Sequence, residues 1–588
     1  MLKESEFLVL NDLRQAGETG AATTQRHIAE RTGLSLGTVN STVKLLQDRS
    51  YLHDGQISAS GLRALQPYKV DNAIIMAAGL SSRFVPLSYE KPKGTLKVRG
   101  EVLIERIIRQ LQEAGINDIT VVVGYMKEQF LYLEDAFNVQ IVINDAYLER
   151  NNNSSLMLVK EHFANTYILA ADYYFERNIF SPYVYQAYYA AIFVEGPTDE
   201  WVLRTGSGDH IVKTFIGGSD EWIMYGEAYF DKAYSRRFAE ILTEVYDRPE
   251  TRPKLWEEIY ADHIKELDMV IRRYPAGVLH EFDSLADVRA FDSGFLANID
   301  SAILDNICAV LQCQREQITD IAPIPEGLSN FSFFFRVGEG GYVYRHPGAA
   351  TQGILNRAVE AEVEGIAAEL GLDATFIYQD AEKGWKISRF VEVTEPFDYH
   401  NQQHVQTALA MVCKLHNSGK SVESNFDLQE ETNKIKQRLL GTSQLDFPDF
   451  QELDQRAARL YAHVQAEGVP LCLCHNDFYE PNILIANEDF YLIDWEYTGM
   501  SDYASDLGTF ICCSDYTQEQ ATEVLETYFG RPLTQAELLH CLIYVSLAGY
   551  YWFIWALNKE AAGESVGEWL HLWYRYAKEY GIIAEQML

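Results

Sequence analysis

Residues 471–495 read LCLCHNDFYEPNILIANEDFYLIDW, and this stretch predicts the fold of the C-terminal part of the chain. Two short apolar strands are expected here, and three polar groups lie beside them: Asp477, Asn482 and Asp494. Phosphoryl transfer from ATP needs a carboxylate that orients the substrate hydroxyl, and oxygen ligands that hold magnesium against the phosphates. A polar surface hairpin would not be expected to combine HxDxxxxN, a following strand and IDWE. The stretch therefore indicates a site for phosphoryl transfer.

At these residues the chain resembles the choline kinase and aminoglycoside phosphotransferase family, whose loop reads HxDxxxxN and whose metal motif is IDxE. The resemblance implies a bilobal, protein-kinase-like domain in which Asp477 is the catalytic base. It also implies that Asn482 and Asp494 bind Mg²⁺, that His475 shapes the loop and that Asp506 braces it. The residues implied to contact ATP are Ser329, Asn330, Arg345 and Glu360.

One of these residues departs from the pattern of many kinases. Arg345 stands where they have lysine, and a planar guanidinium does not substitute freely for an ammonium. Choline kinases of the bacterial type tolerate arginine there, so the departure favours that branch of the family.

The end of the chain is rich in aromatic residues, and the resemblance implies that some of them bind choline. A quaternary ammonium cannot donate hydrogen bonds, so aromatic faces and a nearby carboxylate suit it. Trp552 and Trp555 are spaced to share one helix face, and we expect them to form a choline site with Glu496. Aromatic stripes more often belong to a core, and the tyrosine that the family has on the following helix falls at His571 here.

The length and charge of the chain limit its organisation and its partners. At 588 residues it is too long for one core, and we expect domains at residues 1–67, 71–292 and 297–588. The net charge of −36 argues against broad affinity for nucleic acid or anionic membranes. The eight cysteines contain no CxxC pair and follow no signal peptide, so we expect reduced thiols in the cytoplasm. The apolar run 542–557 is too short for a full membrane span and is expected to be a buried helix.

The first 67 residues predict a small helical module. Helices are expected over residues 4–15, 24–31 and 35–48, with a tight turn at Gly33 and a wing over residues 52–62. This order resembles the winged helix-turn-helix of bacterial regulators. Basic and acidic residues cancel in the segment, whereas a DNA reader normally shows a basic face. We therefore favour docking or dimerisation over DNA binding, and homo-oligomer formation stays open.

Residues 72–79, NAIIMAAG, predict a buried strand that runs into a loop of small residues. A loop without bulky side chains can cradle an anion, and Arg83 and Lys93 would add cations for a triphosphate. A helix over residues 103–114 and a strand over 119–123 follow, which is typical of alternating α/β structure.

This segment resembles the nucleotidyltransferase family with its AAGxGxR…PK signature, and most closely the branch that makes CDP-choline from CTP and phosphocholine. The resemblance implies a Rossmann-like α/β/α domain in which Asp172 and Asp283 bind Mg²⁺ and Lys93 and Arg83 assist catalysis. Ser81 stands where many members have glycine. The residues implied to bind the nucleotide are Ala77, Ala78, Gly79, Ser81, Ser82 and Gly124.

A phosphocholine site needs the same features as a choline site. We expect Trp201, Trp256 and Tyr260 to supply aromatic faces and Glu281 to supply the carboxylate. For each tryptophan alone, packing in a core is the competing interpretation.

Together these patterns predict a multidomain α/β enzyme that phosphorylates choline with ATP and then couples phosphocholine to CTP, releasing pyrophosphate. The resemblance implies that the product serves phosphocholine decoration of a bacterial surface polymer. Two alternatives stay open: a pair of activities on ethanolamine or a sugar, and a winged-helix regulator whose other domains only sense nucleotide or choline.

Overall fold

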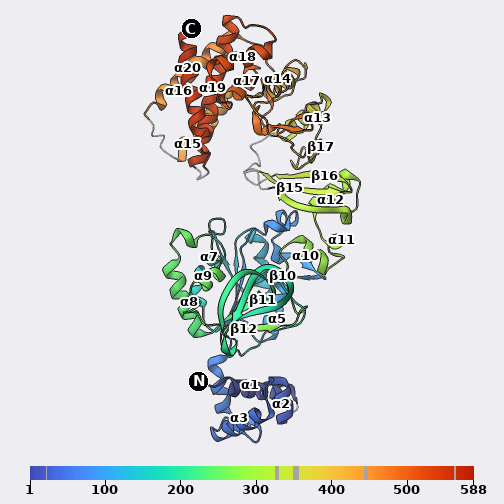
Figure 1. Cartoon of the computed structure of the whole chain (residues 1–588), viewed down its shortest axis with the longest axis vertical. Coiled ribbons are helices and arrows are strands. Elements are labelled where there is room, and N and C mark those ends of the chain that lie inside the picture. The colour runs from blue at the N-terminus through green and yellow to red at the C-terminus, as the bar shows by residue number, and fades with distance from the viewer. Residues whose placement is uncertain (22, 325–329, 348–356, 443–447, 562–564) are drawn as a thin grey trace. The chain divides into compact units, whose positions relative to one another are not determined.

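The computed structural model of the protein describes residues 1–21, 23–324, 330–347, 357–442, 448–561 and 565–588. These residues form two compact units, Met1–Asp305 and Asn306–Leu588 (Figure 1). The first unit contains a small helical module and an α/β domain. The second contains an antiparallel sheet and a helical lobe.

The helical module has the predicted helix-turn-helix order. Thr24 and Ser35 cap the second and third helices through their side-chain oxygens, and Gly33 closes the second helix in the left-handed conformation. The expected wing over residues 52–62 is shorter than predicted, because the hairpin ends at Ile57 and a fourth helix begins at Ala59. The elements are α1 (Glu4–Thr19), α2 (Gln25–Thr32), α3 (Leu36–Asp48), β1 (Leu52–His53), β2 (Gln56–Ile57) and α4 (Ala59–Leu65).

This module packs on the α/β domain through aromatic side chains. The rings of Phe7 and Tyr68 lie 5.1 Å apart, and Tyr68 stacks on Tyr185 at 5.6 Å. The backbone N–H of Leu2 donates to the Tyr68 hydroxyl at 2.8 Å. The guanidinium of Arg14 lies 4.6 Å from the ring centroid of Tyr183. Residues of both segments therefore share one apolar cluster.

The α/β domain is built on a seven-stranded sheet in the order β12-β10-β11-β8-β3-β6-β7. The central strand β3 pairs in parallel with β6 and β8, so the loops that follow these three strands meet at one edge of the sheet. The strands are β3 (Asn72–Ala77), β6 (Ile119–Val123), β7 (Gln140–Ile143), β8 (Thr166–Ala170), β10 (Tyr188–Thr205), β11 (Ile211–Phe230) and β12 (Val270–Tyr274).

Helices cover both faces of this sheet. Successive side chains of β3 point to opposite faces, so neighbouring residues of this strand pack in different cores. Ile75 packs in a core with α5 (Leu103–Glu113), whereas Ile74 packs in a second core with α8 (Lys232–Val245) and α9 (Trp256–Asp262). Figure 1 shows α5 and α8 on different sides of the sheet. The predicted α/β/α class is confirmed.

Shorter elements complete this unit. β9 pairs with β13 so that Tyr173 lies opposite Glu281, which brings the segment after β8 beside the segment after β12. The elements are β4 (Lys97–Val98), β5 (Glu101–Val102), α6 (Tyr132–Phe137), α7 (Asn153–Leu158), β9 (Tyr173–Phe175), β13 (Leu279–Glu281), α10 (Leu285–Phe291) and α11 (Phe295–Asn298). Helix α12 (Ala302–Leu311) contains the boundary between the two units.

The second unit begins with a five-stranded antiparallel sheet in the order β14-β15-β16-β18-β17. Helix α13 packs beside it. The elements of this part are β14 (Ile318–Ile324), β15 (Asn330–Val337), β16 (Gly340–Pro347), α13 (Arg357–Glu369), β17 (Phe376–Gln379) and β18 (Lys386–Arg389).

The helical lobe follows, and the HxDxxxxN and IDWE motifs lie in loops between the strands of two small two-stranded sheets. One sheet pairs β19 (Cys472–Cys474) with β22 (Gly499–Ser501), and the other is the hairpin of β20 (Ile483–Ala486) and β21 (Asp489–Leu492). The helices are α14 (Gln402–His416), α15 (Leu428–Thr442), α16 (Phe450–Glu467), α17 (Ala504–Cys512), α18 (Gln518–Phe529), α19 (Gln535–Ala561) and α20 (Trp569–Met587). A sheet lobe and a helical lobe make up the predicted bilobal fold.

Helix α19 contains the apolar run 542–557. Among the described residues it is the one helix long and apolar enough to cross a membrane, yet 83% of its apolar window is buried inside the protein. It is the central helix of this lobe, packing against α15, α17 and α20. This confirms the predicted buried helix.

Candidate active sites

The loops after β3 and β6 form the floor of the first candidate site. Ser81 has a φ of 53°, in the left-handed region that glycine adopts without a steric penalty. A Cβ on Gly124 would lie 2.9 Å from the Ala78 carbonyl oxygen, so glycine is needed where the two loops touch. The glycine that many nucleotidyltransferases have in place of Ser81 is explained by this backbone conformation.

Two adjoining cavities open above these loops. The first has a volume of about 220 Å³, and its wall contains Ala77, Ala78, Gly79, Ser81, Lys93 and Asp172. The second, of about 800 Å³, shares four of these residues and adds Ser82, Arg83 and Asp283. The structure thus brings together the predicted nucleotide loop, both predicted cations and both predicted metal ligands.

Asp172 and Lys93 form the polar centre of this site. The Nζ of Lys93 lies 2.6 Å from Oδ2 of Asp172, while Oδ1 of Asp172 is buried without a hydrogen-bond partner. Asp283 lines the second cavity together with Asp172, and its Oδ1 lies 3.5 Å from the guanidinium of Arg83. A buried, unpartnered carboxylate oxygen beside a second carboxylate suits a divalent cation with oxygen ligands.

Two further buried carboxyl groups interact with each other near this centre: Glu281, which the sequence predicted, and Glu257, which it did not assign. The carboxyl of Glu257 accepts hydrogen bonds from Asn152 at 3.2 Å and from the Tyr189 hydroxyl at 3.3 Å, and its burial raises its pKa to about 7. Burial, together with the charges of Asp172 and Asp283, raises the pKa of Glu281 well above its ordinary value. The sequence held a clue to Glu257, because this residue directly follows Trp256, one of the aromatic residues predicted to bind phosphocholine.

The aromatic residues expected around phosphocholine lie elsewhere. Trp256 and Tyr260 are 1% and 0% exposed and belong to the core between the sheet and α8; neither is among the residues lining the two cavities. Trp201 also packs against that core, while the carboxyl of the preceding Glu200 interacts with the charges of Asp283 and Arg83. We therefore correct the assignment of Trp256 and Tyr260, which are packing residues.

The loop that carries Asp477 in the second unit is held by hydrogen bonds from behind. The carboxylate of Asp506 accepts from the backbone N–H groups of His475 at 2.9 Å and Asn476 at 2.5 Å. His475 accepts from the N–H of Asp477 through Nδ1 at 3.3 Å and donates through Nε2 to the Ile493 carbonyl at 3.0 Å. These contacts connect the loop directly to the IDWE segment.

Asp477 and Asn482 face each other within this loop. The side-chain amide of Asn482 donates to Oδ2 of Asp477 at 2.8 Å, which directs its oxygen away from Asp477. Oδ1 of Asp477 is buried and has no hydrogen-bond partner. Burial raises the pKa of Asp477 well above its ordinary value, and the charges of Asp494 and Glu496 raise it further. Burial and Asp494 likewise raise the pKa of Glu496 to about 7.

Arg345 connects the sheet lobe to the metal motif. Its guanidinium forms an ion pair with Glu360 on α13 and lies 3.3 Å from Oδ1 of Asp494. Although burial opposes it, Arg345 and Arg357 hold the pKa of Glu360 at about 2. Of the other residues expected to contact ATP, Asn330 begins β15 and Ser329 lies outside the described residues.

A cavity of about 690 Å³ joins these acids to an aromatic wall. Asp477, Asp494 and Glu496 lie along it, and so do both predicted tryptophans, Trp552 and Trp555. Five further aromatic residues line the cavity and were not assigned to the choline site from the sequence, and all but Tyr551 come from other segments of the chain: Phe426, Tyr479, Tyr497, Tyr551 and Trp573. His571, where the family's tyrosine was expected to fall, is exposed.

Three family models match the chain. Residues 320–539 match the phosphotransferase enzyme family, residues 73–232 match the MobA-like NTP transferase domain, and residues 6–70 match the Firmicute plasmid replication protein RepL.

Curated relatives match the middle and C-terminal segments separately. The choline-phosphate cytidylyltransferase of Streptococcus pneumoniae is 35% identical over 220 residues, which cover 37% of this chain and 96% of the relative. The 2-aminoethylphosphonate cytidylyltransferase of Lancefieldella rimae is 37% identical over 229 residues, covering 38% and 93%. Protein LicA of Haemophilus influenzae is 28% identical over 258 residues, covering 41% and 94%.

Proposed function

The chain belongs to the nucleotidyltransferase family through its middle domain and carries a phosphotransferase-family domain after it, and on this premise we propose that it makes CDP-choline in two steps. The C-terminal domain would transfer the γ-phosphoryl group of ATP to choline. The middle domain would then join phosphocholine to CTP with release of pyrophosphate.

In the first step, Asp477 orients the choline hydroxyl and accepts its proton. Oδ1 of Asp477 is free for this contact because Asn482 occupies Oδ2. The amide oxygen of Asn482 and the carboxylate of Asp494 would hold Mg²⁺, which neutralises phosphate charge when bound. Arg345, between Glu360 and Asp494, is placed to contact the phosphates.

In the second step, a phosphate oxygen of phosphocholine attacks the α-phosphorus of CTP, and pyrophosphate leaves from the opposite side. Lys93 and Arg83 stabilise the negative charge that develops on the phosphates. The small residues of the loop after β3 let the nucleotide approach the backbone. Asp172 and Asp283 would hold Mg²⁺, and the unpartnered Oδ1 of Asp172 supports this assignment.

The observation that carries the choline assignment is the single cavity that joins Asp477 to the wall of Trp552, Trp555 and Trp573. A quaternary ammonium binds to aromatic faces, whereas a primary ammonium needs hydrogen-bond acceptors at fixed positions. The Trp555 ring already holds a cation in this structure, because the Nζ of Lys559 lies 5.5 Å from its centroid.

Two observations bear on the substrate that the transferase joins to CTP and on the cellular compartment of the enzyme. A phosphotransferase makes a phosphate ester, so its presence in the same chain favours phosphocholine over 2-aminoethylphosphonate, which has a carbon–phosphorus bond. Both co-substrates are nucleoside triphosphates, and no disulfide joins any of the eight cysteines, which supports a cytoplasmic enzyme that supplies an activated donor for a surface polymer.

Parallel measurement of kcat/KM tests these assignments. Choline should exceed ethanolamine as substrate of the phosphotransferase, and phosphocholine should exceed 2-aminoethylphosphonate as substrate of the transferase. A preference for ethanolamine would remove the choline assignment. A preference for 2-aminoethylphosphonate would mean that the two domains act on different substrates.

A further inference from the structure

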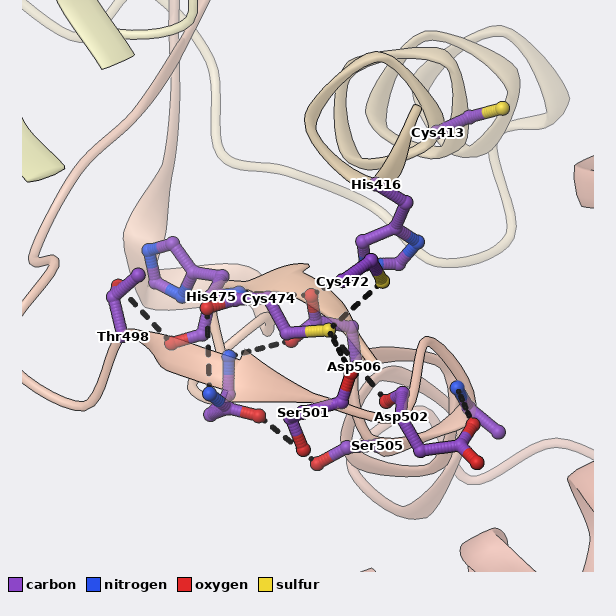
Figure 2. Close-up of polar contacts among 12 residues, drawn as sticks. Cys413, His416, Cys472, Cys474, His475, Thr498, Ser501, Asp502, Ser505 and Asp506 are labelled. Carbon is purple, nitrogen blue, oxygen red and sulfur yellow. Dashed lines mark hydrogen bonds and ion pairs between the residues drawn. The ribbon is translucent and has the colours of Figure 1, made fainter. Parts of the chain in front are cut away.

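A histidine and two cysteines meet on the far side of the loop that carries Asp477. One ring nitrogen of His416 on α14 and the sulfurs of Cys472 and Cys474 on β19 all lie within 4.8 Å of one another. Figure 2 shows His416 directed from its helix towards the two cysteines of the strand. None of the three lines the cavity that contains Asp477, so the proposed reaction does not use them.

The spacing of the two sulfurs suits a shared metal ion. They lie 3.6 Å apart, and two thiolates on a tetrahedral Zn²⁺, at about 2.3 Å each, lie about 3.8 Å apart. A disulfide is less suitable, because residues i and i+2 of a strand have Cα atoms about 6.6 Å apart, near the upper limit for a disulfide.

The hydrogen bonds of His416 leave one nitrogen suited to a metal. Nε2 lies 2.8 Å from Oδ2 of Asp506, a carboxylate that can only accept, so Nε2 carries the proton. Nδ1 is then the nitrogen with a lone pair, and it accepts from the Tyr528 hydroxyl at 2.7 Å.

We propose that Nδ1 of His416 and the sulfurs of Cys472 and Cys474 bind Zn²⁺, with the Tyr528 hydroxyl or a water molecule as fourth ligand. Both thiols release their protons to solvent on binding, and the two thiolates then balance the double positive charge of the ion. A neutral site is compatible with this buried position. Soft thiolate and imidazole ligands exclude Mg²⁺, which prefers oxygen.

The site would act on the catalytic loop through Asp506. A metal-bound histidine commonly donates its other N–H to a carboxylate, and Nε2 of His416 already donates to Asp506. Asp506 in turn accepts from the N–H groups of His475 and Asn476, immediately before Asp477. Bound zinc would therefore fasten α14 to β19 and hold this loop in place.

The test uses the reduced full-length protein, stripped of metal with a chelator and titrated with Co²⁺ and then Zn²⁺. Cobalt should add a thiolate-to-metal absorption band at one equivalent, and zinc should abolish it. Cys472→Ser is the main variant because this thiol is half-buried and its loss is tolerated best; it should lose the band. Cys413→Ser is the matched control, since Cys413 lies one turn before His416 with its sulfur directed away from the pair (Figure 2).

Two further measurements keep the test decisive if the variant folds poorly. Zinc should protect Cys472 of the unmodified protein from alkylation, read by mass spectrometry, and should raise the melting temperature of the wild type and of Cys413→Ser. Absence of a cobalt–thiolate band in the wild type would overturn the proposal. So would an unchanged band in Cys472→Ser, or alkylation of Cys472 at the same rate with and without zinc.

Discussion

At the scale of single residues, Asp477 is set apart by its surroundings. One carboxylate oxygen is held by Asn482 and the other is buried without a partner. Leaving such an oxygen unpaired destabilises the fold, which is consistent with a group kept for a substrate.

Asp477→Asn tests this assignment. The variant keeps the shape of the side chain but cannot accept the substrate proton, so phosphocholine formation should fall by about 10²–10⁴-fold. CTP-dependent conversion of supplied phosphocholine should be unchanged. Asp489→Asn, at an exposed acid on β21, serves as the control and should behave as the wild type. Equal loss of both activities in Asp477→Asn would contradict independent sites.

We expect Glu257 to make the transferase sensitive to pH, because its buried carboxyl accepts a hydrogen bond at 3.2 Å from Asn152, which lines the first cavity. Its pKa is raised to about 7, so the carboxyl is ionised above this value and loses its charge as the pH falls through it. The choline cation would then be bound less strongly, and the KM for phosphocholine should rise about fivefold, the effect of about 1 kcal/mol of charge attraction. Glu257→Gln should show the higher KM at every pH. The pH dependence that remains in this variant should come only from ionisation of the substrates. A KM in this variant that equals the wild-type value above neutral pH would remove Glu257 from the site.

The sequence predicted the acidic residues better than the aromatic ones. Asp477, Asn482 and Asp494 stand in motifs with fixed spacing. In the structure Asp477 and Asp494 line one cavity, and Asn482 is hydrogen-bonded to Asp477. Trp256 could not be assigned in this way, because a tryptophan on a helix has the same sequence signature whether it faces a ligand or a core. Only the three-dimensional packing against Phe230 and Phe238 separates the two cases.

At the scale of elements, α19 supplies one wall of the phosphotransferase cavity. Trp552 and Trp555 both line the cavity, as their spacing predicted. The ring centroid of Trp573, from α20, lies 5.8 Å from that of Trp552. The sequence located this helix because its apolar run is long. It could not show that Tyr479 and Tyr497, from the loops that carry the two motifs, would complete the wall.

Trp555→Leu should weaken choline binding while preserving the apolar contacts of the helix. A desolvated cation–π contact is worth about 2 kcal/mol, so the KM for choline should rise roughly thirtyfold with little change in kcat. Trp569→Leu, on the next helix and not among the cavity-lining residues, is the matched control. A change of less than about threefold in Trp555→Leu would assign this ring to packing.

The elements of the α/β domain were only partly predictable. The strands 72–77 and 119–123 are short apolar runs, and both were expected. The hairpin of β10 and β11 was not anticipated, because much of its outer part is exposed and its register shifts at several positions. Alternation of apolar and polar residues is lost at such irregularities.

At the scale of the whole molecule, the role of the helical module stays a prediction. Three of its cations are held by internal ion pairs: Arg31 with Asp12, Arg49 with Glu6 and Arg14 with Glu18. These pairs leave less positive charge for phosphates, so we expect no specific binding of duplex DNA at about 0.15 M salt. A gel-shift series across salt concentrations measures this. A sequence-dependent complex whose affinity falls steeply with salt would show that the module reads DNA.

The central claim is that one chain performs two consecutive reactions on choline. Incubating the full-length protein with choline, ATP, CTP and Mg²⁺, and resolving the products by mass over time, tests it most directly. We predict that phosphocholine appears first and is converted to CDP-choline, and that Asp172→Asn stops the conversion and lets phosphocholine accumulate. Formation of neither product by the intact protein, with supplied phosphocholine also left unchanged, would contradict the account.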